Sequence, residues 1–149
     1  MTDRQPLILV SNDDGFLAPG VRHLIDMLVP FGRVIAVCPD GPRSGQSMAI
    51  TVNQALRITR VDDFEKAEMY KVNGTPADCV KLAMAAICPR RPNLIVAGIN
   101  HGSNSAVNVV YSGTMGAVFE GCAIGVPSLG FSLTDHSMHA DFEPCRPFV

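Results

Sequence analysis

The stretch LILVSNDDGFLAPGVRHL, residues 7–24, guides the interpretation of the whole chain. Its four apolar residues at 7–10 form a continuous run, which predicts a strand buried on both faces. Two adjacent carboxylates, Asp13 and Asp14, come almost directly after that strand, and Gly15 permits a sharp turn behind them. Two like charges held close together repel each other unless a cation lies between them. The stretch therefore predicts a divalent-cation site where a buried strand ends.

Strand and helix patterns alternate along the rest of the chain. Pro19 suits a first helical turn, and the apolar residues at 21, 24, 25 and 28 predict an amphipathic helix. Residues 33–38 predict a second buried strand, and the order strand, helix, strand indicates parallel pairing. Further strands are predicted at 49–52, 56–59, 69–72, 94–97 and 128–133, and further helices at 77–87 and 112–124. The alternation predicts an α/β doubly wound sheet, with 49–52 and 56–59 as a hairpin outside it.

Length and composition indicate a single globular domain. The chain has 149 residues, of which 47% are hydrophobic and 17% charged, and we expect one domain over residues 1–149. A net charge of −2 argues against nucleic acid and against an anionic membrane surface as partners. No apolar run approaches the roughly 20 residues of a membrane span, and no signal-peptide pattern precedes the first strand. Five cysteines without a CxxC motif predict reduced thiols, so we expect a cytoplasmic protein.

Three polar segments follow predicted strands and supply oxygen ligands. Besides Asp13 and Asp14, these segments contain Ser44 at 39–46 and Asn100 after 94–97. Because the carboxyl ends of parallel strands meet at one edge of a sheet, we expect these side chains to converge. An all-oxygen set with two carboxylates suits Mg²⁺ or Mn²⁺. The alternative is that Asp13 caps the following helix and Asp14 is a solvated turn residue.

The segment YSGTMG, residues 111–116, opens a predicted helix and could bind an anion. Ser112 and Thr114 offer hydroxyl groups, and Gly113 lets backbone N–H groups approach an anion at the helix N-terminus. Asn104 could also donate to a phosphate oxygen. The alternative is that Ser112 is an ordinary helix N-cap. Close to a divalent metal, the same segment would form a phosphate cradle.

Several enzyme classes do not fit the sequence. The GPRSGQS loop at 41–47 lacks the lysine of a P-loop, and neither G-x-S-x-G nor a G-x-G-x-x-G after the first strand occurs. A haloacid-dehalogenase-type phosphatase needs D-x-D, whereas the equivalent spacing here places Asn12 at the nucleophile position. His136 and His139 are spaced H-x-x-H without a nearby third soft ligand, so we interpret them as a surface pair.

Four ordered stretches of the chain resemble the survival protein SurE family of metal-dependent 5′-nucleotidases. These stretches are LVSNDDG, PDGPRSGQS, NGTPADCVKLA, and GINHGSN followed by YSGTMGAVFEG. They come in the order found in that family and cover nearly all of the chain. The chain departs from the family pattern in one loop, where a usual glycine is Ala106 and a usual acidic residue is Asn108.

The resemblance implies a SurE-like three-layer α/β/α fold with a mainly parallel, Rossmann-like sheet. It also implies hydrolysis of nucleoside 5′-monophosphates, with 3′-nucleotidase or exopolyphosphatase side activity, by homodimers or homotetramers. On that pattern the ligands of one Mg²⁺ or Mn²⁺ ion are Asp13, Asp14, Ser44 and Asn100. Phosphate would be contacted by Asn104, Ser112, Gly113 and Thr114, with Asn12 beside the acidic pair. Members of the family are longer, so we expect a C-terminal segment to be missing here.

Two questions about the chemistry stay open at this level. Asp13 or Asp14 could orient and deprotonate a water nucleophile, or one of them could attack phosphorus directly. The chain could also be a non-catalytic module that binds metal or nucleotide, or a general phosphatase for small substrates.

Overall fold

The computed structural model describes residues 5–62, 64–137 and 139–149 and shows one six-stranded sheet between two helical layers. The strands are β1 (Leu7–Ser11), β2 (Arg33–Pro39), β3 (Ile58–Val61), β4 (Glu68–Val72), β5 (Leu94–His101) and β6 (Ser128–Leu133). The helices are α1 (Pro19–Leu28), α2 (Pro76–Leu82), α3 (Asn108–Tyr111) and α4 (Gly113–Ala123), with single turns η1 (Ala83–Ile87) and η2 (Glu143–Cys145). The strand order is β3-β4-β2-β1-β5-β6, and only β3 runs antiparallel to its neighbour.

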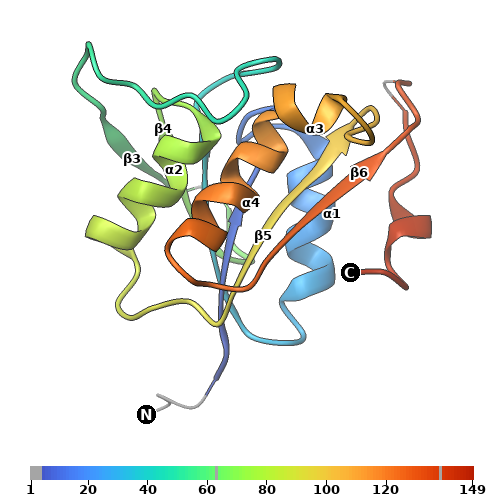
Figure 1. Cartoon of the computed structure of the whole chain (residues 1–149). Coiled ribbons are helices and arrows are strands. Elements are labelled where there is room, and N and C mark those ends of the chain that lie inside the picture. The colour runs from blue at the N-terminus through green and yellow to red at the C-terminus, as the bar shows by residue number, and fades with distance from the viewer. Residues whose placement is uncertain (1–4, 63, 138) are drawn as a thin grey trace.

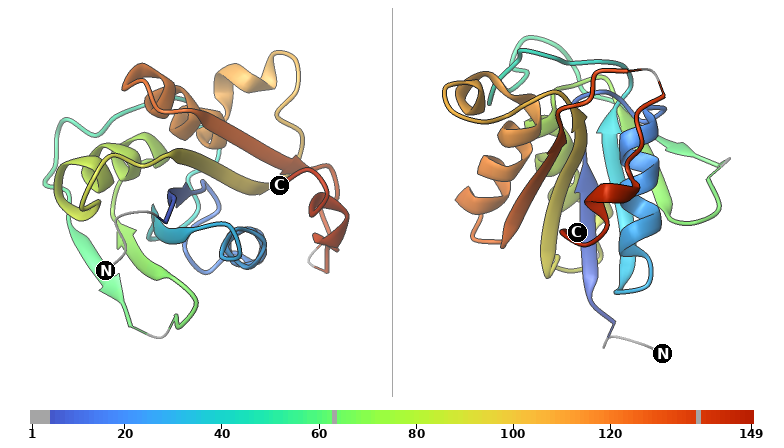
Figure 2. Two further views of the ribbon diagram at one scale, coloured as in Figure 1. Left: turned by 90° about the horizontal axis from the view of Figure 1, so that it is seen from below. Right: turned by 90° about the vertical axis from the view of Figure 1, so that its right-hand side faces the viewer.

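Different helices cover the two faces of the sheet, as Figures 1 and 2 show. Successive side chains of a strand point to opposite faces, so Ile8 and Val10 pack in the layer of α1. Leu7 and Leu9 pack instead in the layer of α2 and α4. The C-terminal residues lie on the α1 side, where the fully buried Phe142 ring contacts His23 and His101. The predicted α/β class and the three-layer, mainly parallel architecture are confirmed.

The strongly periodic elements match their predicted positions. α1 buries Val21, Leu24, Ile25 and Leu28, as the spacing predicts. The predicted strands at 33–38, 69–72 and 128–133 correspond to β2, β4 and β6. β5 is longer than predicted and continues through Asn100 to His101. The predicted helix at 77–87 is α2 followed by a single π-helical turn, η1.

The predicted hairpin outside the sheet is wrong. Residues 49–52 form no strand, and β3 begins later than predicted and pairs with β4 inside the main sheet. The physical reason is that side chains occupy the backbone groups of this segment. Asp78 accepts from the N–H of Thr51, and Asn73 contacts the backbone of Ala55 and Arg57. A segment held by side chains in this way has no ladder of free backbone groups to offer another strand.

All five cysteines are unpaired thiols. Within the described ranges, the helices are too short or too polar to cross a membrane.

The carboxyl edge of the sheet positions the polar loops. β1 pairs with β2 on one side and with β5 on the other, and the chain visits β2 before β5. The strand order therefore reverses direction at β1, and ligands of doubly wound folds bind in the crevice that such a reversal leaves. The turn formed by Asp13, Asp14 and Gly15 after β1, called the acidic turn below, lies where the strand order reverses, and so does the end of β5.

Candidate metal and phosphate site

Asp13 is a buried carboxylate between the end of β1 and the start of α4. Only 4% of the residue is exposed, and Asp13 Oδ1 accepts one hydrogen bond, 2.6 Å from Thr114 Oγ1. Gly113 packs so close that an added Cβ would lie 2.7 Å from Asp13 Cβ. Burial raises the pKa of the Asp13 carboxyl, the Thr114 hydrogen bond opposes this rise, and the charge of Asp14 adds to it. The fold thus holds an acidic group whose negative charge the chain compensates only in part.

Asp14 and Asn100 bring further oxygens to the same edge of the sheet. The backbone N–H of His101 donates to Asp14 Oδ2 over 3.3 Å, which ties the acidic turn to the end of β5. Asn100 is buried, and its Nδ2 donates to the carbonyl of Gly102 over 2.9 Å. No hydrogen bond from a described residue reaches its amide oxygen, the atom that would act as a ligand. The end of β1 and the end of β5 together supply two carboxylates and one amide oxygen.

Ser44 is less firmly placed than the other three predicted ligands. It lies exposed in the loop after β2, and its hydroxyl makes no hydrogen bond to any residue that the structure describes. The preceding residue anchors the loop, because Arg43 N donates to the backbone oxygen of Asp13 over 2.7 Å. Ser44 is thus held one residue away from a direct contact with the acidic turn.

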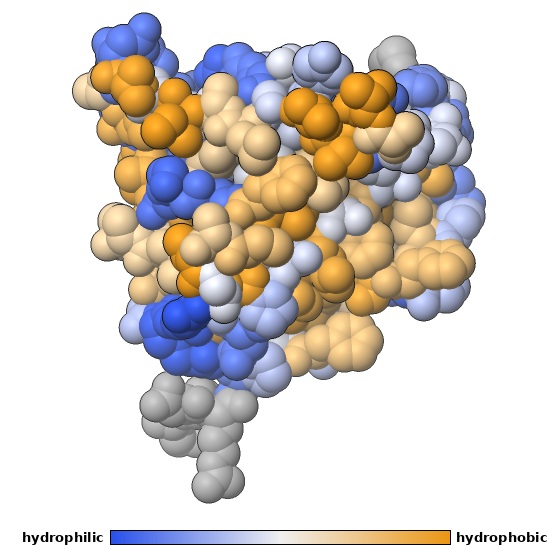
Figure 3. Space-filling model, viewed as in Figure 1, coloured by the Kyte–Doolittle hydropathy of each residue, from blue (hydrophilic) through white to orange (hydrophobic). Residues whose placement is uncertain are grey.

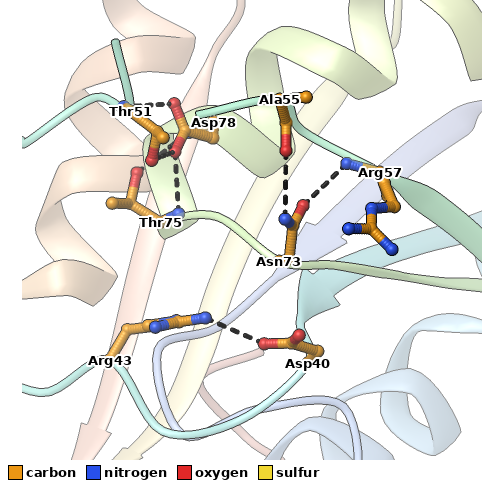
Figure 4. Close-up of polar contacts among 8 residues, drawn as sticks. All are labelled: Asp40, Arg43, Thr51, Ala55, Arg57, Asn73, Thr75 and Asp78. Carbon is orange, nitrogen blue, oxygen red and sulfur yellow. Dashed lines mark hydrogen bonds and ion pairs between the residues drawn. The ribbon is translucent and has the colours of Figure 1, made fainter. Parts of the chain in front are cut away.

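A second buried carboxylate, Asp78, binds Thr51 in the loop after β2, the loop that also contains Ser44 (Figure 4). Asp78 accepts from Thr51 N, Thr51 Oγ1 and Thr75 N at 3.0, 2.6 and 2.9 Å. Thr75 and Asp78 also form a capping box at the start of α2. Burial by itself raises the pKa of Asp78, but the hydrogen bonds from Thr51 and Thr75 outweigh it and hold the pKa below its ordinary value.

The sequence pattern led to no prediction for the hydrogen bonds of Asp78 with Thr51 and Thr75, although part of this arrangement can be seen in the sequence. The residues TPAD, 75–78, have the Thr-x-x-Asp spacing of a capping box. What the spacing does not reveal is the long-range partner, Thr51. The contacts of Arg43 and His101 with the acidic turn were also missed, and they involve backbone atoms that no side-chain pattern encodes.

The residues predicted to contact phosphate lie around the N-terminus of α4 and in the loop after β5, and the contact itself stays a prediction. Ser112 Oγ accepts from Met115 N, so Ser112 is the N-cap of α4. Thr114 uses its hydroxyl proton on Asp13, and Asn104 Nδ2 donates to Ser132 Oγ over 2.6 Å. Gly113 lies in the first turn of α4, directly against Asp13. The N-terminus of α4 and the acidic turn are therefore neighbours.

The side chain of Asn12 forms a hydrogen bond within the acidic turn. It is buried, and its Nδ2 donates to the carbonyl of Gly15 over 2.8 Å. Its Oδ1 finds no hydrogen-bond partner among the described residues. A buried acceptor without a donor is costly unless a ligand or water supplies one.

The donor set fits a hard divalent cation. Asp13 does not cap α1, because the N-cap of that helix is Ala18 and no side chain caps it. This excludes the structural alternative for Asp13. In the described part of the chain, no group of three or more His, Cys, Asp and Glu residues could hold a metal, and His136 and His139 are exposed. The carboxylate and amide oxygens are ligands that Mg²⁺ and Mn²⁺ accept.

The departure from the family pattern has a measurable structural consequence. Ala106 adopts a φ of 55°, in the left-handed region that favours glycine. An alanine there costs about 1 kcal/mol relative to its usual conformations. Asn108 begins the short helix α3, and its N–H donates to Ser105 O.

Exposed apolar side chains gather around this edge of the sheet. Figure 3 shows hydrophobic surface over α3, and the exposed apolar residues of this region include Met48, Ile50, Val107, Val110 and Tyr111. The backbone N–H of Ser47 donates to Tyr111 O over 3.2 Å, which joins the loop after β2 to α3.

Comparison with known proteins agrees with this architecture. The family model described as "Survival protein SurE" matches residues 8–149. Relatives named "5'-nucleotidase SurE" from Bacteroides thetaiotaomicron and Bacteroides fragilis are each 51% identical, over 100% of this chain and 58% of the relative. The crystal structure of the SurE protein from Aquifex aeolicus has a TM-score of 0.85 at 35% identity, covering 96% of this chain and 56% of that one. The chain thus spans 58% of the length of those curated relatives. With its sequence matched almost from end to end and its fold shared, the chain belongs to the SurE family.

Proposed function

We propose that this chain carries the metal and phosphate site of a phosphomonoesterase that releases phosphate from nucleoside 5′-monophosphates. The relatives that it matches are named 5'-nucleotidase SurE, and the chain spans 58% of their length. The observation that carries the proposal is the Asp13 carboxylate, which is buried against the N-terminus of α4 and whose raised pKa shows that hydrogen bonds do not offset its burial and the nearby charge of Asp14. A cation would complete this site, and a phosphate would then lie between the cation and α4.

The proposed cofactor is one Mg²⁺ or Mn²⁺ ion held by Asp13, Asp14, Ser44 and Asn100. Such an ion, when bound, neutralises charge on phosphate oxygens and lowers the pKa of a coordinated water. Asp13 and Asp14 supply the negative charge that attracts it. The loop that contains Ser44 is held by Arg43 on one side and by Asp78 on the other.

The protein groups have distinct proposed roles. The N–H groups in the first turn of α4, with Gly113 as the point of close approach, stabilise negative charge on the transferring phosphoryl group. The hydroxyl of Ser112 accepts from Met115 N and keeps its own proton for a phosphate oxygen. Asp14 is more exposed than Asp13, which favours it as the group that orients or deprotonates the nucleophilic water. Direct attack by a carboxylate on phosphorus would leave an acyl phosphate that can be trapped.

The decisive experiment measures phosphate release from 5′-AMP and 5′-GMP with Mn²⁺, with Mg²⁺ and with EDTA. It compares this chain, its Asp13→Asn variant and the Bacteroides thetaiotaomicron relative. We expect metal-dependent turnover that the variant loses. Undiminished activity in the variant or in EDTA would contradict the metal-centred proposal.

Two controls separate the alternative functions. Saturable Mn²⁺ or nucleotide binding without turnover, beside an active relative, would identify a non-catalytic module. Equal turnover of p-nitrophenyl phosphate and nucleotides would identify a general phosphatase. Activity with 3′-nucleotides and with short polyphosphate is measured in the same assay, because the proposal includes both as side activities.

The proposal extends to assembly and location. We propose a homodimer or homotetramer, which the exposed apolar side chains around α3 support. Sedimentation velocity of the chain and of the longer relative tests this. The unpaired state of all five cysteines supports a reducing, cytoplasmic compartment.

A further inference from the structure

A shallow pocket of about 290 Å³ lies at the carboxyl ends of β2 and β4, beside the candidate metal site. Thr59 and Lys71 are cross-strand partners in the β3–β4 ladder. Residues two apart on extended backbone face the same side, which places Arg57 beside Thr59 and Asn73 beside Lys71. The lining of the pocket consists of Asp40, Arg57, Thr59, Lys71 and Asn73.

The pocket has an excess of positive charge. Neither the Arg57 guanidinium nor the Lys71 ammonium forms an ion pair with any residue that the structure describes. Lys71 Nζ instead lies 5.2 Å from the centre of the Phe16 ring. The carboxylate of Asp40 is already paired with Arg43 over 2.9 Å. Two cations therefore face the pocket without a carboxylate of their own.

In a larger hollow elsewhere on the molecule, by contrast, the cations have carboxylate partners. That hollow, of about 500 Å³, lies near the opposite ends of β2 and β4. Three of its cations have carboxylate partners: Arg33 pairs with Glu68, Arg60 with Asp62, and Lys66 with Asp26. The smaller pocket alone of these two offers uncompensated positive charge, and it is the one next to the acidic turn.

Two residues connect the pocket to the candidate metal site. Arg43 binds the backbone of Asp13 through its N–H, while its extended side chain reaches Asp40 in the pocket wall (Figure 4). Phe16 follows the acidic turn directly, and the Lys71 ammonium lies over its ring in a cation–π contact. The pocket and the metal site are thus separated by roughly the reach of one arginine side chain.

We propose that this pocket binds a second phosphate group, carried by the sugar of the nucleotide substrate. The inference rests on the proposed function and names its substrate class: a nucleoside bisphosphate whose 5′-phosphate is cleaved while the other phosphate lies between Arg57 and Lys71. Phosphates joined in an anhydride share one oxygen and lie too close together to span an arginine side chain. A ribose between them provides the longer spacing. Arginine and lysine are the usual protein partners of phosphate.

The test compares adenosine 3′,5′-bisphosphate with 5′-AMP, by calorimetric binding in EDTA and by kcat/KM with Mn²⁺. In the unmodified chain we expect the bisphosphate to bind about tenfold more tightly, the usual effect of a charged hydrogen bond. Arg57→Gln and Lys71→Gln should each remove most of this preference. Arg57→Gln keeps the backbone N–H that donates to Asn73 Oδ1, so the loop stays anchored. The control, Arg60→Gln, alters a neighbouring cation that lines the larger hollow, and it should leave the preference intact.

The outcomes separate this inference from the proposed function. Equal affinity for both ligands, or a preference that survives Arg57→Gln and Lys71→Gln, overturns the inference even if 5′-AMP is hydrolysed normally. A preference that both variants lose, in a chain that hydrolyses neither ligand with any metal, supports the pocket and contradicts the proposed function.

Discussion

Two buried aspartates, Asp13 and Asp78, have similar surroundings but pKa shifts of opposite direction. Their exposed fractions are 4% and 2%, and each accepts a 2.6 Å hydrogen bond from a threonine hydroxyl. Each also has a glycine neighbour, since a Cβ on Gly113 would meet Asp13 at 2.7 Å and one on Gly74 would meet Asp78 at 2.7 Å. Yet the pKa of Asp13 is raised and that of Asp78 is lowered.

The balance between burial, hydrogen bonds and neighbouring charge explains the difference. Asp78 receives two backbone N–H bonds in addition to its threonine, and these stabilise its charge within the fold. At Asp13, the hydrogen bond from the Thr114 hydroxyl and the smaller effect of the backbone N–H groups of Asp13 and Thr114 do not offset burial and the charge of Asp14. Burial alone therefore does not distinguish a structural carboxylate from a ligand-binding one. A buried carboxylate whose charge the chain compensates poorly is the better candidate for a cation ligand.

The largest expected effect comes from Asp13→Asn. We expect Mn²⁺ affinity to fall by more than about 100-fold, beyond the loss seen when only an outer partner is removed. The free energy of unfolding in EDTA should not fall, because a neutral amide replaces a poorly compensated charge. Calorimetric Mn²⁺ titration and urea unfolding in EDTA measure the two quantities. A large loss of stability with intact Mn²⁺ binding would assign Asp13 the structural role instead.

Asp78→Ala should produce the opposite pattern. We expect a loss of about 3 kcal/mol in the free energy of unfolding, because the helix cap disappears and the donors of Thr51 and Thr75 lose a charged acceptor. Asp78→Asn retains one acceptor and should lose less. Urea unfolding gives the stability, and Mn²⁺ affinity of the folded variant should fall far less than in Asp13→Asn. Equal losses of Mn²⁺ affinity in the two variants would remove the distinction between the sites.

The two threonine donors allow a matched comparison. Thr114→Val removes the one side-chain donor to Asp13 among the described residues, and we expect Mn²⁺ affinity to fall roughly 10- to 100-fold, as for other partners that orient a metal ligand. Thr51→Val removes the corresponding hydroxyl at Asp78 and should cost about 1 kcal/mol of stability. Its Mn²⁺ affinity should stay at the level of the unmodified chain. A reversal of these outcomes would show that the donors serve the same purpose at both sites.

The smallest expected effect is a difference in pH dependence, measured as unfolding free energy in EDTA. The lowered pKa of Asp78 means that the unfolded chain binds more protons near pH 3.8 and below, so stability rises with pH there. That contribution is complete above the ordinary pKa and is lost as pH falls through the lowered one. The raised pKa of Asp13 has the opposite sign, so stability falls as pH rises from about 3.8 through the raised value. Asp78→Asn should abolish the rise and Asp13→Asn the fall, and identical pH profiles for both variants would contradict the assignment.

Local sequence patterns were sufficient to predict the elements whose burial follows a regular pattern. β1 and β2 are continuous apolar runs, and α1 has a single buried stripe, so each element shows its burial in its own sequence. The segment 49–57 misled because its apolar residues suggest a strand while its backbone is bound by Asp78 and Asn73. Ser44 shows the same limit, since its distance from the acidic turn depends on how a loop is anchored.

The sequence by itself determined the α/β order of the elements, the acidic turn after β1 and the polar residues that follow β2 and β5. These features are local, because hydrophobic periodicity and turn chemistry act between residues close in the chain. Only the tertiary structure decided that Thr114 donates to Asp13, that Thr51 donates to Asp78, and that Arg57 and Lys71 share a pocket. Nothing in the local sequence predicts that the pKa values of Asp13 and Asp78 shift in opposite directions. Their pKa shifts differ in direction because of donors and charges brought from other parts of the chain, and these are fixed only when the sheet is assembled.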